Sequence, residues 1–340
     1  MVTIYDVARQ AGVSAATVSR VFNGQVKVGP DRTQAVRAAA TELGFVPNRN
    51  ARRLRTNSTE IIAMMVPDIA NPFFTLLTRA VEDVARGAGF SVMLCNTDED
   101  YDREQEYLRV AASEPVAGIV MVPSATSNLA FALGRDVPVV CVDRHAPNHD
   151  VDAVVVDNLA ASAAATRLLF SAGYRRLACI TGPADIETSN QRLAGFTEVV
   201  RERTGADPDP DLIQRATYVR DDDGERAALG FFALPNPPDA VFAANNRLAT
   251  GTLRALTRLG LLPPAVGLVS FGGPPQTLFP PPALITTYLP TADMGTTAAR
   301  MLLERIAGLD IPARSITLPV RLTEEPPVVD SKHRSKVESR

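Results

Sequence analysis

From Ile61 onward, short apolar segments alternate with stretches of helical periodicity, and this alternation limits the folds open to the chain. The segment IIAMMVP is followed by the helical FFTLLTRAVEDVARGAG, and FSVMLCN is followed by DREQEYLRVAA. Apolar segments of strand length recur as far as VGLVSFG, which ends at Gly272. Buried strands joined by helices form parallel sheets. The sequence therefore predicts an α/β fold with two parallel-sheet lobes and a ligand cleft at the carboxyl ends of their strands.

Composition indicates a globular protein of two or three domains. Of 340 residues, 46% are hydrophobic and 21% are charged, and this length exceeds one ordinary core. No apolar run approaches the roughly 18 residues of a membrane helix, and the N-terminus lacks a signal-peptide pattern. Cys95, Cys141 and Cys179 lie in separate apolar runs without metal-ligand spacing, which favours core packing in a reducing compartment. We therefore expect a cytosolic protein.

Charge is distributed unevenly along the chain. The net charge is −3, yet residues 1–59 hold nine basic and three acidic side chains. This first segment therefore carries +6, which leaves −9 for the remainder. A small basic head on an acidic body is expected when only the head meets phosphate groups.

The head begins with the frame of a helix-turn-helix. Thr3 and Ser14 can cap two successive helices. Ala8, Gly12 and Val18 have the spacing that this motif needs, with a small residue at the helix contact, a glycine at the corner and a branched residue beneath. A plain helical hairpin could show the same frame.

The outward face of the second helix favours a DNA reader over a plain hairpin. Arg20 could bond guanine bidentately, whereas Ala15 and Ala16 could touch only thymine methyl groups or leave room for shape readout. The side chains suited to phosphate contacts are Tyr5, Thr17, Ser19 and Asn23. We predict that the N-terminal end of this helix enters the major groove.

Three motifs together resemble one protein family. TIYDVARQAGVSAATVSRVFNG, then VPNRNARRLRT after a third helical stretch, then MVPDIANPFF, resemble the lactose-repressor (LacI/GalR) family of bacterial transcription regulators. The resemblance extends through DAVFAANNRLATGTLRAL to about residue 322. It implies a homodimeric repressor of pseudo-palindromic operator DNA, with a small-molecule effector between the lobes and no cofactor. The effector would alter the affinity for the operator. The leucine heptads of tetrameric relatives are not visible.

The resemblance also assigns a hinge. Residues matching Asn50–Arg55 form a short helix in that family, which orders on operator DNA. Leu54 would wedge into the minor groove with Ala51 beside it, bending the duplex. Read alone, NARRLR would be a solvated basic linker. The complete set of expected DNA-contacting residues is Thr3, Ile4, Tyr5, Ala15, Ala16, Thr17, Ser19, Arg20, Asn23, Asn48, Arg49, Ala51, Leu54 and Arg55.

The resemblance divides the chain and places the effector site. The expected parts are a head of residues 1–47, a hinge helix and linker of 48–59, an N-terminal lobe of 60–157 and 288–318, a C-terminal lobe of 158–287 and 319–326, and a disordered tail of 327–340. The implied effector-binding residues are Phe73, Phe74, Asp143, Arg144, Thr188, Arg192, Asn245 and Phe271. For Phe73 and Phe74, burial in the core is an equally good interpretation. Arg192 could fork onto an oxygen-rich ligand.

Two departures from the family pattern concern that site. Many relatives carry Asn-Asp where this chain has Asn245–Asn246, and Gly-Phe-Asp-Asp where it has Ser270–Gly273. In sugar-responsive relatives the aspartate at the Gly272 position accepts hydrogen bonds from sugar hydroxyls, which glycine cannot do. Losing a buried acceptor disfavours ordinary sugar recognition. An anionic ligand, a ligand without that hydroxyl pair, or loss of small-molecule control all stay open.

Two other classes of protein fit less well. For an enzyme, His145 and His149 are the main candidates, but Pro147 between them indicates a loop of solvated histidines. Ser270 lacks the glycine two residues earlier that a nucleophile elbow needs, and no phosphate loop, dinucleotide fingerprint or zinc cluster is present. A transport solute-binding protein would share the body but would carry a signal peptide and no basic head.

Overall fold

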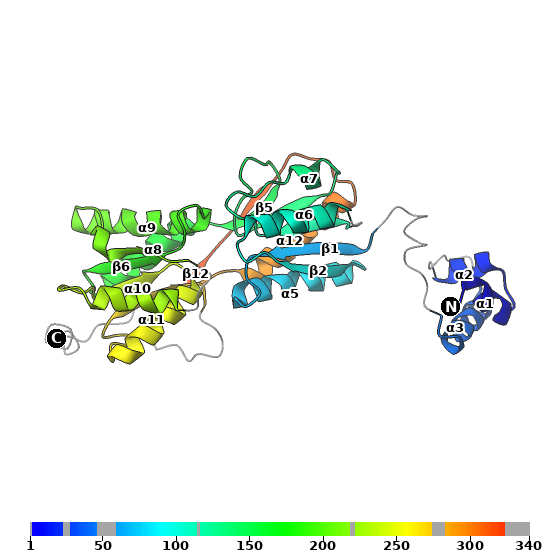
Figure 1. Ribbon diagram of the computed structural model, residues 1–340, viewed down its shortest axis with the longest axis horizontal. Coiled ribbons are helices and arrows are strands. Elements are labelled where there is room, and N and C mark those ends of the chain that lie inside the picture. The colour runs from blue at the N-terminus through cyan, green and yellow to red at the C-terminus, as the bar shows by residue number, and fades with distance from the viewer. Residues whose placement is uncertain are drawn as a thin grey trace. The chain divides into compact units, whose positions relative to one another are not determined.

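The computed structural model describes residues 2–22, 28–45, 59–113, 116–217, 222–273 and 283–323. The chain divides into two compact units, Met1–Thr59 and Glu60–Arg340, which we call the head and the body. Figure 1 labels the elements of each unit. Among the described residues, no helix combines the length and the apolar character needed to cross a membrane.

The described part of the head contains three helices, α1 (Ile4–Gln10), α2 (Ala15–Phe22) and α3 (Pro30–Glu42). The amide and the hydroxyl of Thr3 donate to the Asp6 carboxylate over 2.9 and 2.6 Å at the start of α1. The Ser14 hydroxyl accepts from the amide of Thr17 over 3.1 Å at the start of α2. Gly12 has a φ of +63° at the corner, which glycine adopts without steric cost. Both predicted caps and the glycine corner are confirmed.

A small apolar core holds the three helices together. It consists of Val7, Ala8, Val18, Val21, Val36, Ala39 and Ala40, all of them buried. Each of the three helices contributes to this core, so the core holds α1 and α2 in place against α3.

The first lobe of the body is a six-stranded parallel sheet. Its order is β11-β5-β4-β3-β1-β2, with every neighbouring pair parallel. The strands are β1 (Ile61–Val66), β2 (Ser91–Asn96), β3 (Gly118–Met121), β4 (Val139–Val142), β5 (Asp152–Val156) and β11 (Ser315–Leu318). Helices α5 (Pro72–Gly87) and α12 (Thr291–Ile306) cover one face, and α6 (Tyr101–Ser113) and α7 (Ala130–Leu133) cover the other.

The second lobe repeats this arrangement with one antiparallel edge strand. Its sheet has the order β12-β10-β9-β8-β6-β7. The strands are β6 (Leu177–Thr181), β7 (Ile213–Arg215), β8 (Ala240–Ala243), β9 (Gly267–Phe271), β10 (Ile285–Tyr288) and β12 (Arg321–Leu322). Helices α8 (Asn158–Ser171) and α9 (Glu187–Thr204) pack on one face, and α10 (Asp223–Phe232) and α11 (Asn246–Leu259) on the other. The two-lobed α/β prediction is confirmed, except that β12 runs antiparallel to β10.

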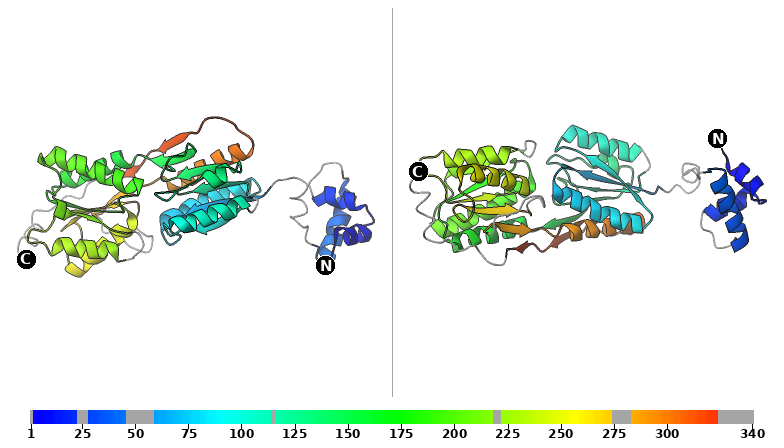
Figure 2. Two further views of the ribbon diagram at one scale, coloured as in Figure 1. Left: turned by 45° about the horizontal axis from the view of Figure 1, so that its top comes forward. Right: turned by 90° about the horizontal axis from the view of Figure 1, so that it is seen from below.

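Three short segments join the two sheets of the body. They lie between β5 and α8, between β10 and α12, and between β11 and β12, and the views in Figure 2 follow them from one lobe to the other. The carboxyl ends of the parallel strands therefore meet where the lobes face each other. The cysteines Cys95, Cys141 and Cys179 are buried free thiols, and burial raises the pKa of Cys141 to about 12. Their predicted core packing is confirmed.

Asp152, the first residue of β5, connects this strand to α12 and to the segment before the edge strand β11. Its buried carboxylate accepts two hydrogen bonds from the Arg305 guanidinium on α12, over 2.8 and 3.0 Å. It also accepts from the backbone and side chain of Arg314, over 2.8 and 3.0 Å. Burial alone would raise the pKa of Asp152, but the bonds from Arg305 and Arg314 outweigh it and lower the pKa to about 2. The ionised carboxylate therefore stabilises the fold.

We expect Asp152→Asn to lower the free energy of unfolding at pH 7 by about 2 kcal/mol, because that is the linkage energy of the lowered pKa. A carboxyl with a lowered folded-state pKa stabilises the fold above its unfolded pKa of about 4 and loses that contribution as the pH falls toward about 2. The deficit of the variant should therefore be constant from pH 5 to pH 8 and shrink below pH 4. Urea unfolding followed by circular dichroism measures it.

Asp136→Asn is the matched control, because Asp136 is exposed and the same charge is removed. Surface changes of this kind stay within about 0.5 kcal/mol. Equal effects of the two variants would contradict the role given to Asp152.

Candidate functional site

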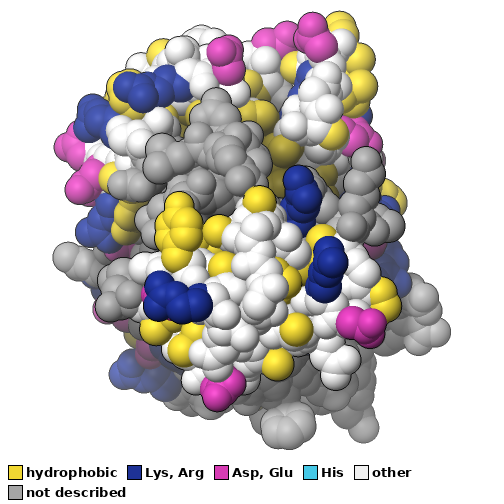
Figure 3. All heavy atoms as spheres, turned by 90° about the vertical axis from the view of Figure 1, so that its right-hand side faces the viewer, with side chains coloured by type: hydrophobic (Ala, Val, Ile, Leu, Met, Phe, Trp, Pro, Cys, Tyr) yellow, Lys and Arg dark blue, Asp and Glu magenta, His cyan; other side chains and the backbone are white. Residues whose placement is uncertain are grey.

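The outward face of α2 carries four of the eight described residues expected to contact DNA. Ala16 and Arg20 are exposed, and Thr17 and Ser19 are half-buried. On α1, Tyr5 leaves 69% of its surface exposed. Figure 3 shows separate Lys and Arg side chains among hydrophobic and other groups on the side that Figure 1 draws at the right.

Two of the expected DNA-contacting residues also contribute to the core of the head. Ala15 and Ile4 are half-buried and pack against the core of the head, because each lies at the inner edge of its helix. Thr3 is exposed and engaged in the cap described above. The six that lie outside the described residues are Asn23, Asn48, Arg49, Ala51, Leu54 and Arg55.

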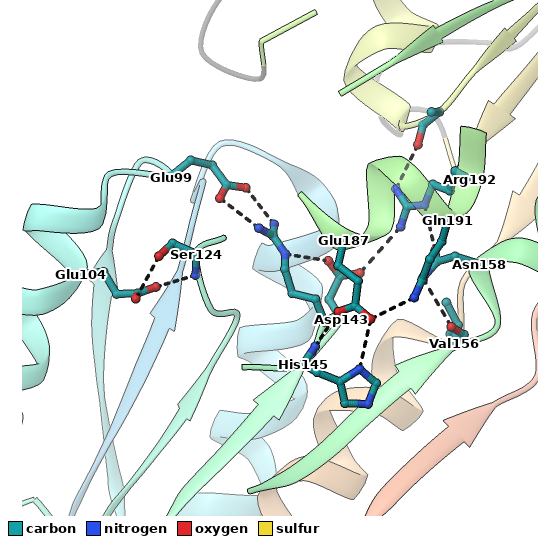
Figure 4. Close-up of polar contacts among 12 residues, drawn as sticks. Glu99, Glu104, Ser124, Asp143, His145, Val156, Asn158, Glu187, Gln191 and Arg192 are labelled. Carbon is teal, nitrogen blue, oxygen red and sulfur yellow. Dashed lines mark hydrogen bonds and ion pairs between the residues drawn. The ribbon is translucent and has the colours of Figure 1, made fainter. Parts of the chain in front are cut away.

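A cavity of about 700 Å³ lies where the two lobes of the body face each other. Its wall is formed by residues that follow or cap the carboxyl ends of the strands in both sheets. All eight residues expected to bind an effector border it, namely Phe73, Phe74, Asp143, Arg144, Thr188, Arg192, Asn245 and Phe271. Figure 4 shows part of this wall and the polar contacts behind it.

Arg192 is fixed in this wall by contacts on every side. Only 6% of its surface is exposed. Its Nε donates to Asn158 Oδ1 over 2.8 Å, and its Nη1 donates to the carbonyl oxygen of Ala244 over 2.9 Å. The guanidinium carbon lies 4.2 Å from the centre of the Phe271 ring, and Nη2 lies 3.8 Å from Asp143 Oδ1. The guanidinium group is therefore held in one plane at the cavity.

Asp143 and Arg144 reach the cavity from the end of β4. Both Nη atoms of Arg144 donate to the carboxylate of Glu99, over 3.0 and 2.8 Å. Burial raises the pKa of Asp143, and the charges of Arg192 and Arg144 only partly offset this rise. Glu99 was not among the residues predicted from the sequence. The signal was available, because the acidic run TDED directly follows β2, and strand ends are where ligands bind in such sheets.

The two phenylalanines combine both interpretations made from the sequence. Phe74 is buried and belongs to the core of the first lobe, and Phe73 packs against that core. Their ring centres lie 5.0 Å apart in an edge-to-face arrangement. Both rings also border the cavity, so core packing and ligand contact do not exclude each other here.

Two polar contacts cross directly from one lobe to the other at this cavity. Asn246 Nδ2 donates to Asn71 Oδ1 over 2.9 Å, and Arg247 Nη1 donates to Asp68 Oδ2 over 2.5 Å. Asn71 Oδ1 also accepts from the amide of Phe73, over 3.0 Å, as the N-cap of α5. An aspartate in place of Asn246 would face this oxygen with a second acceptor. The departure from the family pattern at Asn246 therefore supplies a donor that this contact needs.

Gly272 leaves an open place in the wall. Its φ of +88° favours glycine, and an added Cβ would meet only Asn246 Cβ at 3.7 Å and Leu289 Cδ1 at 3.9 Å. Its own polar groups are satisfied, because its amide donates to Thr287 Oγ1 over 2.8 Å and its carbonyl oxygen accepts from Ser270 Oγ over 2.6 Å. This part of the cavity therefore offers space next to an apolar side chain and no carboxylate.

Charges in the cavity wall are nearly balanced. Five carboxylates and four guanidinium groups line it. Each guanidinium faces a carboxylate of the same wall, in the pairs Arg103–Asp98, Arg144–Glu99, Arg192–Asp143 and Arg247–Asp68. An anion would have to compete with these carboxylates, which disfavours anionic ligands. A neutral ligand with hydrogen-bond donors could bind them without displacing a charge.

Both loop histidines contact other residues, and His149 is less solvated than expected. His149 is half-buried, and its Nε2 accepts from the amide of Leu129 over 3.1 Å. His145 is exposed but contacts Glu187 and Ser315. The prediction of a solvated side chain was wrong for His149, because its loop packs against the residue before α7. Among the described residues, no group of three His, Cys, Asp or Glu side chains could hold a metal ion.

The head and the body each match a known protein family. Residues 3–48 match the model of bacterial regulatory proteins of the lacI family, and residues 166–324 match that of the periplasmic binding protein-like domain. The chain is 32% identical over 323 residues to the ribose operon repressor of Halalkalibacterium halodurans, covering 95% of this chain and 96% of the relative. It is 30% identical over 309 residues to the repressor CytR of Escherichia coli, covering 90% of each.

Solved structures show the same fold. A complex of the transcriptional regulator CelR with cellobiose is 29% identical and superposes with a TM-score of 0.69, covering 95% of this chain and 98% of that chain. A lac repressor dimer bound to operator superposes with a TM-score of 0.84 at 24% identity, covering 97% and 99%. Through its head, its two-lobed body and its full-length similarity to these repressors, the chain belongs to the lacI family of bacterial regulatory proteins.

Proposed function

We propose that this protein is a repressor that binds operator DNA in a sequence-specific manner and whose affinity for the operator changes when a small molecule occupies the cavity. The observation that carries the proposal is the presence in one chain of a capped helix-turn-helix, with Arg20 exposed on α2, and a cavity lined by both lobes. The protein acts in the cytoplasm as a regulator and not as an enzyme.

The cavity supports a neutral effector rich in hydrogen-bond donors. Its arginines are already paired with carboxylates, so donors on the effector would meet carboxylate oxygens at its acidic edge. At Gly272 the effector would turn a part without hydroxyl groups toward Leu289. One relative is named a ribose operon repressor, and a similar solved structure is a complex with cellobiose. These two sugars are therefore suitable first probes. An effector lacking one hydroxyl pair fits this cavity better than a complete sugar ring.

A homodimer would bring two heads to one pseudo-palindromic operator. Apolar side chains that support a subunit interface lie on the edge of the first lobe, where Leu76 of α5 is 47% exposed and Leu94 of the edge strand β2 is 48% exposed. Edge strands and exposed apolar patches are common sites of pairing. The proposed division keeps residues 60–157 with 288–318 in the lobe that carries this face, and 158–287 with 319–326 in the other.

Arg20→Ala should relax base preference and weaken operator binding by about 1–3 kcal/mol, because a bidentate contact to guanine is lost. Gel shifts with genomic fragments at physiological salt, competed with non-specific DNA, measure both effects. Arg109→Ala removes the same charge from the exposed face of α6 and should bind like the unaltered protein. The absence of sequence-selective binding by the unaltered protein would overturn the proposed function.

Leu54→Ala should weaken specific binding while the body unfolds at an unchanged temperature, because an apolar wedge unstacks a base step without taking part in folding. Binding to a specific and a non-specific fragment is compared, together with thermal unfolding. An unchanged ratio of the two affinities would show that Leu54 is not a wedge.

Asn246→Asp should weaken the contact between the lobes, because a carboxylate would face Asn71 Oδ1 in a buried position. Facing acceptors without a shared proton are unfavourable there. We expect a larger radius of gyration in small-angle X-ray scattering and a lower temperature of unfolding. Asn236→Asp, the same change at an exposed position, serves as the control and should alter neither quantity.

A further inference from the structure

A chain of hydrogen-bonded side chains begins at the cavity and leads behind it. Arg192 Nε donates to Asn158 Oδ1 over 2.8 Å, and Asn158 Nδ2 donates to Gln191 Oε1 over 3.1 Å. Gln191 Nε2 then donates to Glu187 Oε1 over 2.9 Å. Figure 4 shows these side chains in sequence. Each amide uses its oxygen as the acceptor and its nitrogen as the donor, so the chain has one consistent direction.

The chain ends in the opposite lobe. Glu187, the first residue of α9 in the second lobe, accepts from the backbone amide of His145 over 2.9 Å. The other oxygen of Glu187 lies 3.2 Å from His145 Nδ1, and His145 Nε2 lies 3.0 Å from Ser315 Oγ. His145 follows β4 and Ser315 begins β11, and both of these strands belong to the first sheet. The contacts between Glu187 and His145 therefore span the lobe boundary.

Asn158 occupies the point where the first connection enters the second lobe. It is the first residue of α8, directly after the segment that leaves β5. Its side chain is buried, and Nδ2 also lies 3.4 Å from the carbonyl oxygen of Val156. A buried amide in such a network is costly to leave without partners. A rotation of one lobe against the other acts on this position.

We propose that Asn158 and Gln191 are positioning residues for Arg192, and that Glu187 and His145 extend this positioning to the opposite lobe. The plane of the cavity guanidinium and the closure of the lobes then change together. The reason is geometric, because hydrogen bonds from a guanidinium group to a ligand need a fixed plane. If the lobes separate, Glu187 loses the amide of His145 and must rearrange, and Gln191 and Asn158 follow. The proposal rests on the proposed function for the ligand that Arg192 meets.

Side-chain NMR of the full chain tests the positioning without any ligand. The Arg192 Nε–H resonance is identified by its loss in Arg192→Lys, and its exchange with solvent is measured. Asn158→Leu removes the acceptor and should speed exchange by about tenfold or more, as for a lost hydrogen bond to a charged group. Asn158→Asp keeps an acceptor for Nε but loses the donor to Gln191 Oε1, so its exchange should be slower than in Asn158→Leu but faster than in the unaltered protein. Unchanged exchange in Asn158→Leu would overturn the positioning role.

A second pair of variants tests the connection to the other lobe. His145→Ala removes the imidazole from Glu187 and Ser315 but keeps the backbone amide that donates to Glu187, and we expect a moderate increase in the rate of Arg192 Nε–H exchange in this variant. His149→Ala lies in the same loop, contacts Leu129 instead, and should leave that exchange unchanged. Equal exchange in the unaltered protein and in His145→Ala would overturn the part of the coupling assigned to the His145 side chain. If Asn158→Leu does not fold, Gln191→Glu replaces it, because it removes the donor to Glu187 at a half-buried position.

Thermal shift with ribose and cellobiose as probes separates this proposal from the proposed function. A probe that stabilises the unaltered protein should stabilise Arg192→Lys and His145→Ala less. No stabilisation of the unaltered protein by either probe would count against a sugar-like effector. The exchange measurements would still decide the positioning chain, because they need neither probe nor DNA.

Discussion

A buried positive charge, the guanidinium of Arg192, governs the arrangement of the body. A charge removed from water must be paired or hydrogen-bonded to be tolerated. Its partners come from separate parts of the chain: Asp143 from the end of β4, Asn158 from the first connection between the lobes, and Ala244 from the end of β8. No single element could satisfy this group. Asn158 and Ala244 belong to the same lobe as Arg192, whereas the carboxylate of Asp143 comes from the other lobe, so the pairing of this charge joins the cavity to the lobe boundary.

The need to pair buried polar and charged groups also bears on the two departures from the family pattern, at Gly272 and Asn246. Gly272 removes a carboxylate from the wall, but Asp98 and Glu99 bring others from the loop after β2. Asn246 supplies a donor to Asn71 Oδ1. The carboxylate of an aspartate at position 246 would repel this oxygen. Acidic groups are thus shifted toward the first lobe, beside Arg103 and Arg144. An effector that uses them would be recognised mainly by the first lobe at its polar edge and by Leu289 and the open place at Gly272 on the other side.

Local patterns were enough to predict the head and the order of α/β units, because caps, glycine corners and buried strands depend on neighbours in sequence. The sequence analysis missed β10, β11 and β12, since segments such as ITTY and SITL are short and mixed in polarity. Their strand character comes from sheets already formed beside them. The contact between Arg247 and Asp68 was missed for a related reason. Such pairs join residues that only the tertiary fold brings together.

The backbone at the strand ends shows how consecutive residues reach the same cavity. Successive side chains of a strand point to opposite faces, yet Asp143 and Arg144 both border the cavity. Asp143 has a φ of 71°, a left-handed conformation that is unusual outside glycine and costs free energy. Asp98 and Glu99, with φ of 53° and 56°, do the same after β2. Two strands therefore end in left-handed turns that direct consecutive charged side chains into one cavity, and the ion pairs with Arg103, Arg144 and Arg192 offset the strain.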